Sequence, residues 1–146
     1  MYENRYCNQD DFSVLVCGGR TENNKVVKTV YKLDGRELKC NNFTSMPNEL
    51  FDCQTVVVNS ELFVFGGYLQ NDGFNRLVRK FCNKTQTWLH VTKLHFHKFA
   101  CSCSFKNNLY VIRGNKMFFV YYLKNDKWTQ LADTKQIRYY AACTVF

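Results

Sequence analysis

The sequence predicts an all-β fold built from repeated antiparallel units of about four short strands each. Aromatic residues make up 16% of the 146 residues, and proline occurs once. Phe and Tyr favour strands, so this composition indicates little helix. A second observation is a repeat, because an apolar strand that ends on glycine recurs at Gly19, at Gly67 and at Gly114. Repeats of this length are typical of arrays of equivalent supersecondary units.

The glycine signals mark the end of one strand in each repeat. Residues 12–19, 62–67 and 109–114 are apolar runs, and the third has a single glycine because Arg113 replaces the first of the pair. A strand that ends on Gly-Gly can turn through positive φ and lets a neighbouring backbone approach closely. The glycines that mark the repeats are Gly18, Gly19, Gly66, Gly67 and Gly114.

An aromatic residue follows each glycine signal, with a large apolar residue seven positions later. The three pairs are Tyr31 with Leu38, Phe81 with Trp88, and Tyr121 with Trp128. We expect the members of each pair to lie on adjacent antiparallel strands and to fill the space between neighbouring units. These residues are therefore predicted to belong to the core, and none indicates a cofactor site.

The repeat divides the chain into five segments. Residues 1–11 form a polar lead-in, and residues 12–50 form a first repeat that lacks its first strand. The second and third repeats cover residues 51–97 and 98–138, and residues 139–146 begin a fourth.

This pattern resembles kelch repeats over residues 12–146. Leu38 departs from it at the position of the first Trp, and Arg113 at a glycine position. The resemblance implies a partial kelch-type β-propeller of about three four-stranded antiparallel blades. A closed propeller of this type has about six blades. The chain is therefore expected to be a segment of a longer protein, a truncated product, or half of a homodimer formed by two half-rings.

Composition and charge exclude several classes of protein. The net charge is +8, but the basic residues are spread along the chain without a run of five, which argues against nucleic-acid binding. No apolar stretch is long enough to span a membrane. A signal peptide is not evident, so we expect a cytoplasmic protein whose eight cysteines stay reduced.

Catalytic and metal-binding motifs are not evident either. The sequence has no nucleophile elbow, phosphate-binding loop or dinucleotide fingerprint, so no enzyme activity and no cofactor are predicted. His95, His97, Cys101 and Cys103 are the right ligand types for zinc, but their spacing is poor and no metal is expected. Cys101 or Cys103, beside His97 and Lys98, would be the candidate for a reactive thiol.

The loops that follow the second and fourth strands of each repeat are the candidates for binding a partner. They are longer than the hairpin turns at the opposite end and carry aromatic and basic side chains, which suit protein contacts. Their slight basic excess favours an acidic peptide segment. The alternative is that each of these residues is merely a solvated loop residue. The candidates are Arg20, Tyr68, Arg76, His97, Lys98, Arg138 and Tyr139.

The kelch resemblance implies a non-enzymatic protein-binding module. Many similar proteins use the propeller to recruit substrates to a cullin-type ubiquitin ligase, so this chain is expected to be the substrate-recognition part of a kelch-like adaptor. Docking to a cullin would need a BTB region, which this sequence does not contain. The alternative is a cytoskeletal kelch protein that binds actin filaments, because the +8 charge suits their acidic surface.

Overall fold

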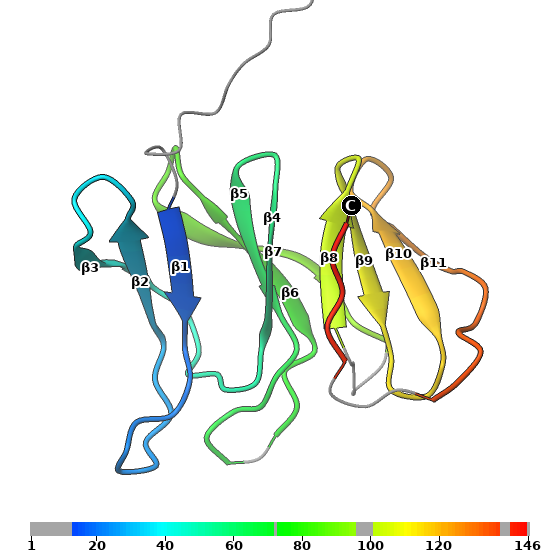
Figure 1. The fold of residues 1–146 in the computed structure, drawn as a ribbon, viewed down its shortest axis with the longest axis horizontal. Coiled ribbons are helices and arrows are strands. Elements are labelled where there is room, and N and C mark those ends of the chain that lie inside the picture. The colour runs from blue at the N-terminus through cyan, green and yellow to red at the C-terminus, as the bar shows by residue number, and fades with distance from the viewer. Residues whose placement is uncertain (1–12, 72, 96–100, 138–140, 146) are drawn as a thin grey trace, which may run out of the picture.

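Eleven strands in three antiparallel sheets make up the computed structural model, which describes residues 13–71, 73–95, 101–137 and 141–145 (Figure 1). None of the described residues lies in a helix, so the prediction of an all-β chain is confirmed. Nor, within these ranges, is there a helix that could cross a membrane.

Each sheet is formed by strands that follow one another along the chain. The first sheet has the order β1-β2-β3, with β1 at Ser13–Cys17, β2 at Thr29–Asp34 and β3 at Cys40–Ser45. The second has the order β4-β5-β6-β7, with strands Gln54–Val58, Glu61–Phe65, Leu77–Cys82 and Thr87–Lys93. The third has the order β11-β10-β9-β8, and β8 to β11 are Cys101–Phe105, Asn108–Ile112, Phe118–Tyr122 and Lys127–Gln130.

Tight hairpins and longer connections lie at opposite ends of the sheets. The β4–β5 turn places Asn59 and Ser60 at positive φ, and the β8–β9 turn does the same with Lys106 and Asn107. Two consecutive residues with positive φ are typical of type I′ hairpins, which match the twist of the paired strands. These turns lie at the top of Figure 1, and the longer loops that follow β1 and β5 lie at the bottom.

The second sheet is buried on both faces. Successive side chains of a strand point to opposite faces, and on β5 Leu62 and Val64 pack with the first sheet while Phe63 and Phe65 pack with the third. All four residues are at most 5% exposed. This explains why β5 is apolar throughout rather than alternating.

Serine side chains join the second and third sheets along β4 and β8. Ser102 Oγ donates to Gln54 Oε1 at 3.2 Å, and Ser104 Oγ donates to the Val57 carbonyl oxygen at 2.9 Å. Together with the apolar cluster beside them, these bonds fix the two sheets face to face.

Two of the three predicted aromatic pairs lie on adjacent strands as expected. Phe81 is opposite Trp88 with ring centroids 5.4 Å apart, and Tyr121 is opposite Trp128 with centroids 5.0 Å apart. Phe81 packs between the first and second sheets and Tyr121 between the second and third.

The pair predicted in the first repeat, Tyr31 with Leu38, is wrong in register. Tyr31 is opposite Asn42, and the position of the other pairs is taken by Leu33 opposite Cys40. Leu38 lies in the turn, because Asp34 Oδ1 accepts hydrogen bonds from the backbone N–H groups of Arg36 and Glu37 and its carbonyl accepts the Leu38 N–H. This turn places Leu38 two residues before the β3 residue that pairs with Leu33.

Candidate functional site

A close approach of two backbones builds the loop end of the second sheet. Gly67 has a φ of +76°, and a Cβ atom there would lie 2.6 Å from the Phe51 carbonyl oxygen. Glycine is therefore required for the loops at Phe51 and Tyr68 to meet. The Phe51 N–H donates to the Tyr68 carbonyl at 3.0 Å, and the Tyr68 N–H donates to the Phe51 carbonyl at 2.9 Å.

Four side chains from three loops stack in a row at this end of the molecule. The Arg20 guanidinium lies 3.8 Å from the centre of the Phe51 ring. Phe51 stacks on Tyr68 with centroids 5.3 Å apart, and Tyr68 contacts Phe74 at 4.8 Å. Phe74 is 39% exposed. We call Arg20, Phe51, Tyr68 and Phe74 the aromatic stack.

Hydrogen bonds hold the loops of the aromatic stack in place. Asn75 Nδ2 donates to the Gly66 carbonyl at 2.9 Å, and Asn75 Oδ1 accepts from the Leu77 N–H. Gln70 Oε1 accepts from the Val26 N–H at 2.7 Å, which ties this loop to the loop of the first sheet. A surface held in this way loses little conformational entropy when a partner binds.

Two of the predicted contact residues lie in the aromatic stack, and a third lies at the end of the loop that carries Tyr68. Arg20 and Tyr68 both belong to the aromatic stack, whereas Arg76 is exposed at the far end of its loop, where its carbonyl accepts the Leu94 N–H. His97, Lys98, Arg138 and Tyr139 lie outside the described residues. Phe51 and Phe74 were not singled out by the sequence analysis. Large aromatic residues in otherwise polar loops are the signal that could have found them.

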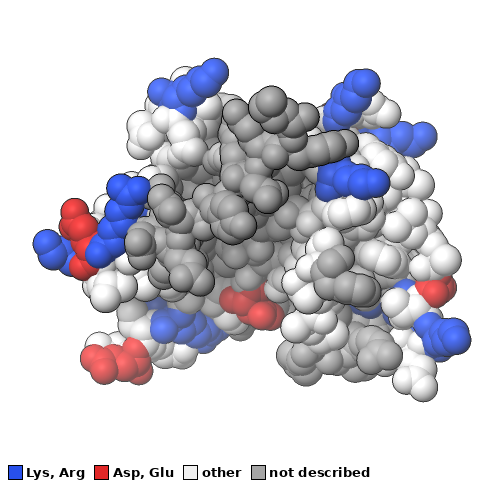
Figure 2. All heavy atoms as spheres, turned by 45° about the horizontal axis from the view of Figure 1, so that its top comes forward, with Lys and Arg blue, Asp and Glu red and all other residues white. Residues whose placement is uncertain are grey.

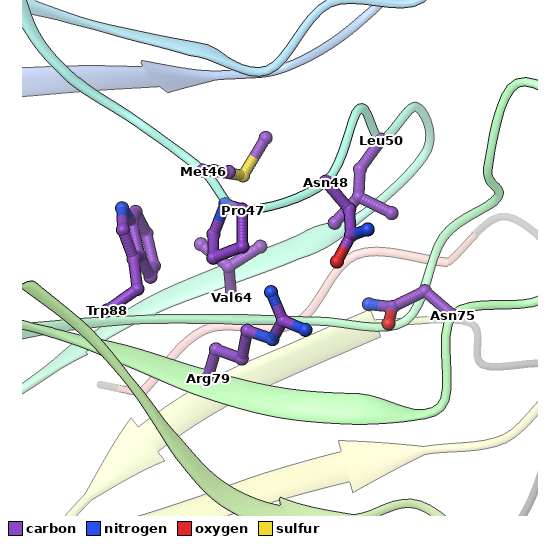
Figure 3. A pocket seen from close by; sticks show the side chains of 8 residues that line it. All are labelled: Met46, Pro47, Asn48, Leu50, Val64, Asn75, Arg79 and Trp88. Atoms are coloured by element: carbon purple, nitrogen blue, oxygen red, sulfur yellow. The ribbon is translucent and has the colours of Figure 1, made fainter.

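A small cavity lies between the first and second sheets, close to the loop end. Its volume is about 10 Å³, which is room for roughly one water molecule. Figure 3 shows the Arg79 guanidinium extending toward Pro47 and Asn48, with Trp88 beside them. This cavity is too small for a substrate. Its lining residues are Met46, Pro47, Asn48, Leu50, Val64, Asn75, Arg79 and Trp88.

Basic side chains do not gather into one patch on the hairpin side of the molecule. Figure 2 shows Lys and Arg side chains in separate groups around the rim of this view, one of them at the upper right, with acidic side chains at the left, bottom and right. Lys80, for example, pairs with Glu61 at 2.9 Å. The described residues in this view therefore form no continuous basic surface for a polyanion.

Burial and hydrogen bonding shift the pKa values of individual cysteine thiols in opposite directions. Burial raises the pKa of Cys17 to about 12 and that of Cys53 to about 11, so both stay protonated at neutral pH. Hydrogen bonds from the Thr85 hydroxyl and from the backbone of Thr85 and Lys84 lower the pKa of Cys82. Among the described residues, no three His, Cys, Asp or Glu side chains are grouped to hold a metal ion.

Comparison with known proteins identifies a shared fold. No protein-family model matches the chain, and no curated protein matches it. The chain is similar to the solved structure of YjhT, with a TM-score of 0.70 and 16% sequence identity over 84% of this chain and 49% of that chain. At this identity the likeness shows the all-β fold alone. The chain spans about half the length of this neighbour.

Proposed function

We propose that the chain is a non-enzymatic protein-binding module, formed by three blades of a kelch-type β-propeller and binding its partner at the loop end. The observation that carries the proposal is the aromatic stack. Aromatic and Arg side chains are enriched among the residues that dominate binding energy at protein interfaces. In the aromatic stack they are held by backbone hydrogen bonds and remain partly exposed at Phe74.

The proposed partner is a protein with an acidic segment, and the proposed role is substrate recognition for a cullin-type ubiquitin ligase. Arg20, whose Nη1 donates to Asn24 Oδ1 at 2.6 Å, supplies positive charge that attracts a carboxylate, and Phe74 supplies apolar contact area. The net charge of +8 would speed the encounter with an acidic partner. A BTB region on another chain or segment would be needed for cullin docking.

A set of three variants tests the binding site. Phe74→Ala and Arg20→Ala remove exposed parts of the aromatic stack, and Leu89→Ala, which is 42% exposed on β7, is the matched control. A partner is captured from cytosolic extract, purified, and titrated against each variant by calorimetry. We expect the dissociation constant to rise about tenfold or more for the two stack variants and to stay unchanged for the control. A partner whose affinity is unaffected by both stack variants would contradict the proposed site.

A second assay separates the adaptor from the alternative function. In the adaptor, fusion of the chain to a BTB region leads to ubiquitylation of the purified partner in a reconstituted cullin reaction, and Phe74→Ala reduces it. Actin binding is the alternative that the +8 charge favours. It predicts that the chain pellets with actin filaments at low salt and is released as the salt concentration rises.

A further inference from the structure

The outer face of the first sheet exposes apolar side chains whose equivalents are buried in both other sheets. Val14 is 46% exposed and Val16 54%. Counting back from the marker glycines Gly19, Gly67 and Gly114, their equivalents are Leu62 and Val64 in the second sheet and Leu109 and Val111 in the third. These four residues are 0–5% exposed. In those sheets the same face is covered by the preceding sheet, whereas no sheet among the described residues covers this face of the first sheet.

The far face of the third sheet also exposes an apolar side chain whose equivalent in the second sheet is buried. Phe105 on β8 is 44% exposed, whereas Val58 at the same position of β4 is 3% exposed. Val58 is buried because it packs in the cluster between the second and third sheets. The outer face of the first sheet and the far face of the third sheet are therefore the two halves of one kind of interface. The chain itself forms this interface twice, between the first and second sheets and between the second and third sheets.

The first sheet also lacks one strand that the other two sheets have. β4 pairs with β5 and β8 pairs with β9, but among the described residues no strand pairs with the corresponding edge of β1. Between the first and second sheets lies a hollow of about 630 Å³, lined on one side by residues of β1, β2 and β3 and on the other by Val57, Ser60, Leu62 and Asn83. Val57 is 53% exposed there.

Residues 141–145 have the position and the chemistry of the strand that is absent. They begin 13 residues after Trp128, as β8 begins 13 residues after Trp88. They run alongside β8 in Figure 1, as β8 runs along β4, and the Cys143 thiol contacts those of Cys101 and Cys103. Like β8, the segment has small and apolar residues, and it is in no strand of its own.

We propose that a second copy of the chain covers the first sheet: residues 141–145 of one copy pair with the free edge of β1 in the other, and the third sheet packs on Val14 and Val16. This interface repeats the contact that the chain makes between its own sheets. Two copies related by a two-fold axis form it twice and leave neither end uncovered.

Molar mass in solution tests the proposal on the full chain. We expect the wild type to have twice the mass of the 17.3 kDa chain by light scattering. Val16→Lys places a charge on the first-sheet face and Phe105→Lys places one on the third-sheet face, and each variant alone is expected to be monomeric. Leu89→Lys, a similar change on an exposed strand outside the interface, is expected to stay dimeric.

Mixing the two monomeric variants distinguishes a lost interface from a lost fold. A Phe105→Lys copy still has an intact first-sheet face and a Val16→Lys copy an intact third-sheet face, so a mixed dimer has one unaltered interface and one that carries both lysines. The mixture is therefore expected to form a one-to-one dimer that is weaker than the wild-type dimer. A monomeric wild type would overturn the proposal, as would a Val16→Lys variant that remains dimeric. None of these results depends on the partner proposed for the aromatic stack.

Discussion

At the scale of single residues, hydrogen bonding makes Cys82 a thiol that is readily deprotonated. Hydrogen bonds from the Thr85 hydroxyl and two backbone N–H groups favour its thiolate, which lowers its pKa, whereas burial raises the pKa of Cys17 and of Cys53. Because the thiolate is the nucleophile, we predict that iodoacetamide modifies Cys82 well before Cys17 and Cys53. The reaction at Cys82 should also persist to lower pH than that of an ordinary thiol. Mass spectrometry of peptides after brief labelling measures both effects.

A single substitution separates this cause from simple accessibility. Thr85→Val removes the hydroxyl donor and keeps the shape of the side chain, so it should slow the labelling of Cys82 and leave Cys40, an exposed thiol, unchanged. Equal labelling rates in the variant and the wild type would show that the hydrogen bond has no such effect. The sequence analysis pointed to Cys101 and Cys103 instead. Cys82 was not found, because the Thr85 hydroxyl reaches its thiol only in the folded β6–β7 turn.

At the scale of elements, the turn between β2 and β3 holds one residue in an unfavourable backbone conformation, which a substitution can relieve. Leu38 has a φ of 53° and is 74% exposed. For a residue with a Cβ atom this conformation costs on the order of 1–2 kcal/mol. Leu38→Gly removes that cost and adds some entropy to the unfolded chain, so the free energy of unfolding should rise by about 0.5–1 kcal/mol. Urea denaturation measures it, with Leu89→Gly on β7 as the control that should lose stability. A less stable Leu38→Gly variant would contradict the prediction.

The same turn shows what the sequence could and could not predict. The strands and the tight hairpins at Asn59 and Lys106 were predictable, because apolar runs and polar turn residues are local signals. The partner of Tyr31 was not, because the spacing of seven residues holds in this hairpin for Leu33 and Cys40, and the aromatic residue Tyr31 lies two positions before Leu33. The aromatic stack was predicted only in part. Phe51 and Tyr68 are far apart in the sequence and meet because Gly67 permits a close backbone approach.

At the scale of the whole molecule, burial decreases from the second sheet toward both ends. β5 is buried at four of its five residues, whereas none of the five residues of β1 is buried. Phe63, Phe65 and Val78 of the second sheet contribute to the cluster shared with the third, and Leu62, Val64 and Phe81 to the cluster shared with the first. The middle sheet therefore cannot open without disrupting both neighbours, and the first sheet can open alone.

This gradient predicts the order in which backbone amides exchange with solvent. Amides of β5 and β6 should be the slowest, because their exchange requires global unfolding, and those of β1 should exchange earlier by local opening. Hydrogen exchange followed by mass spectrometry measures both sets in one experiment. If a second copy covers the first sheet, dilution of the protein should accelerate exchange in β1 and leave β5 unchanged, since only β1 is protected by association. Equal protection of β1 and β5 at every dilution would contradict the gradient of stability.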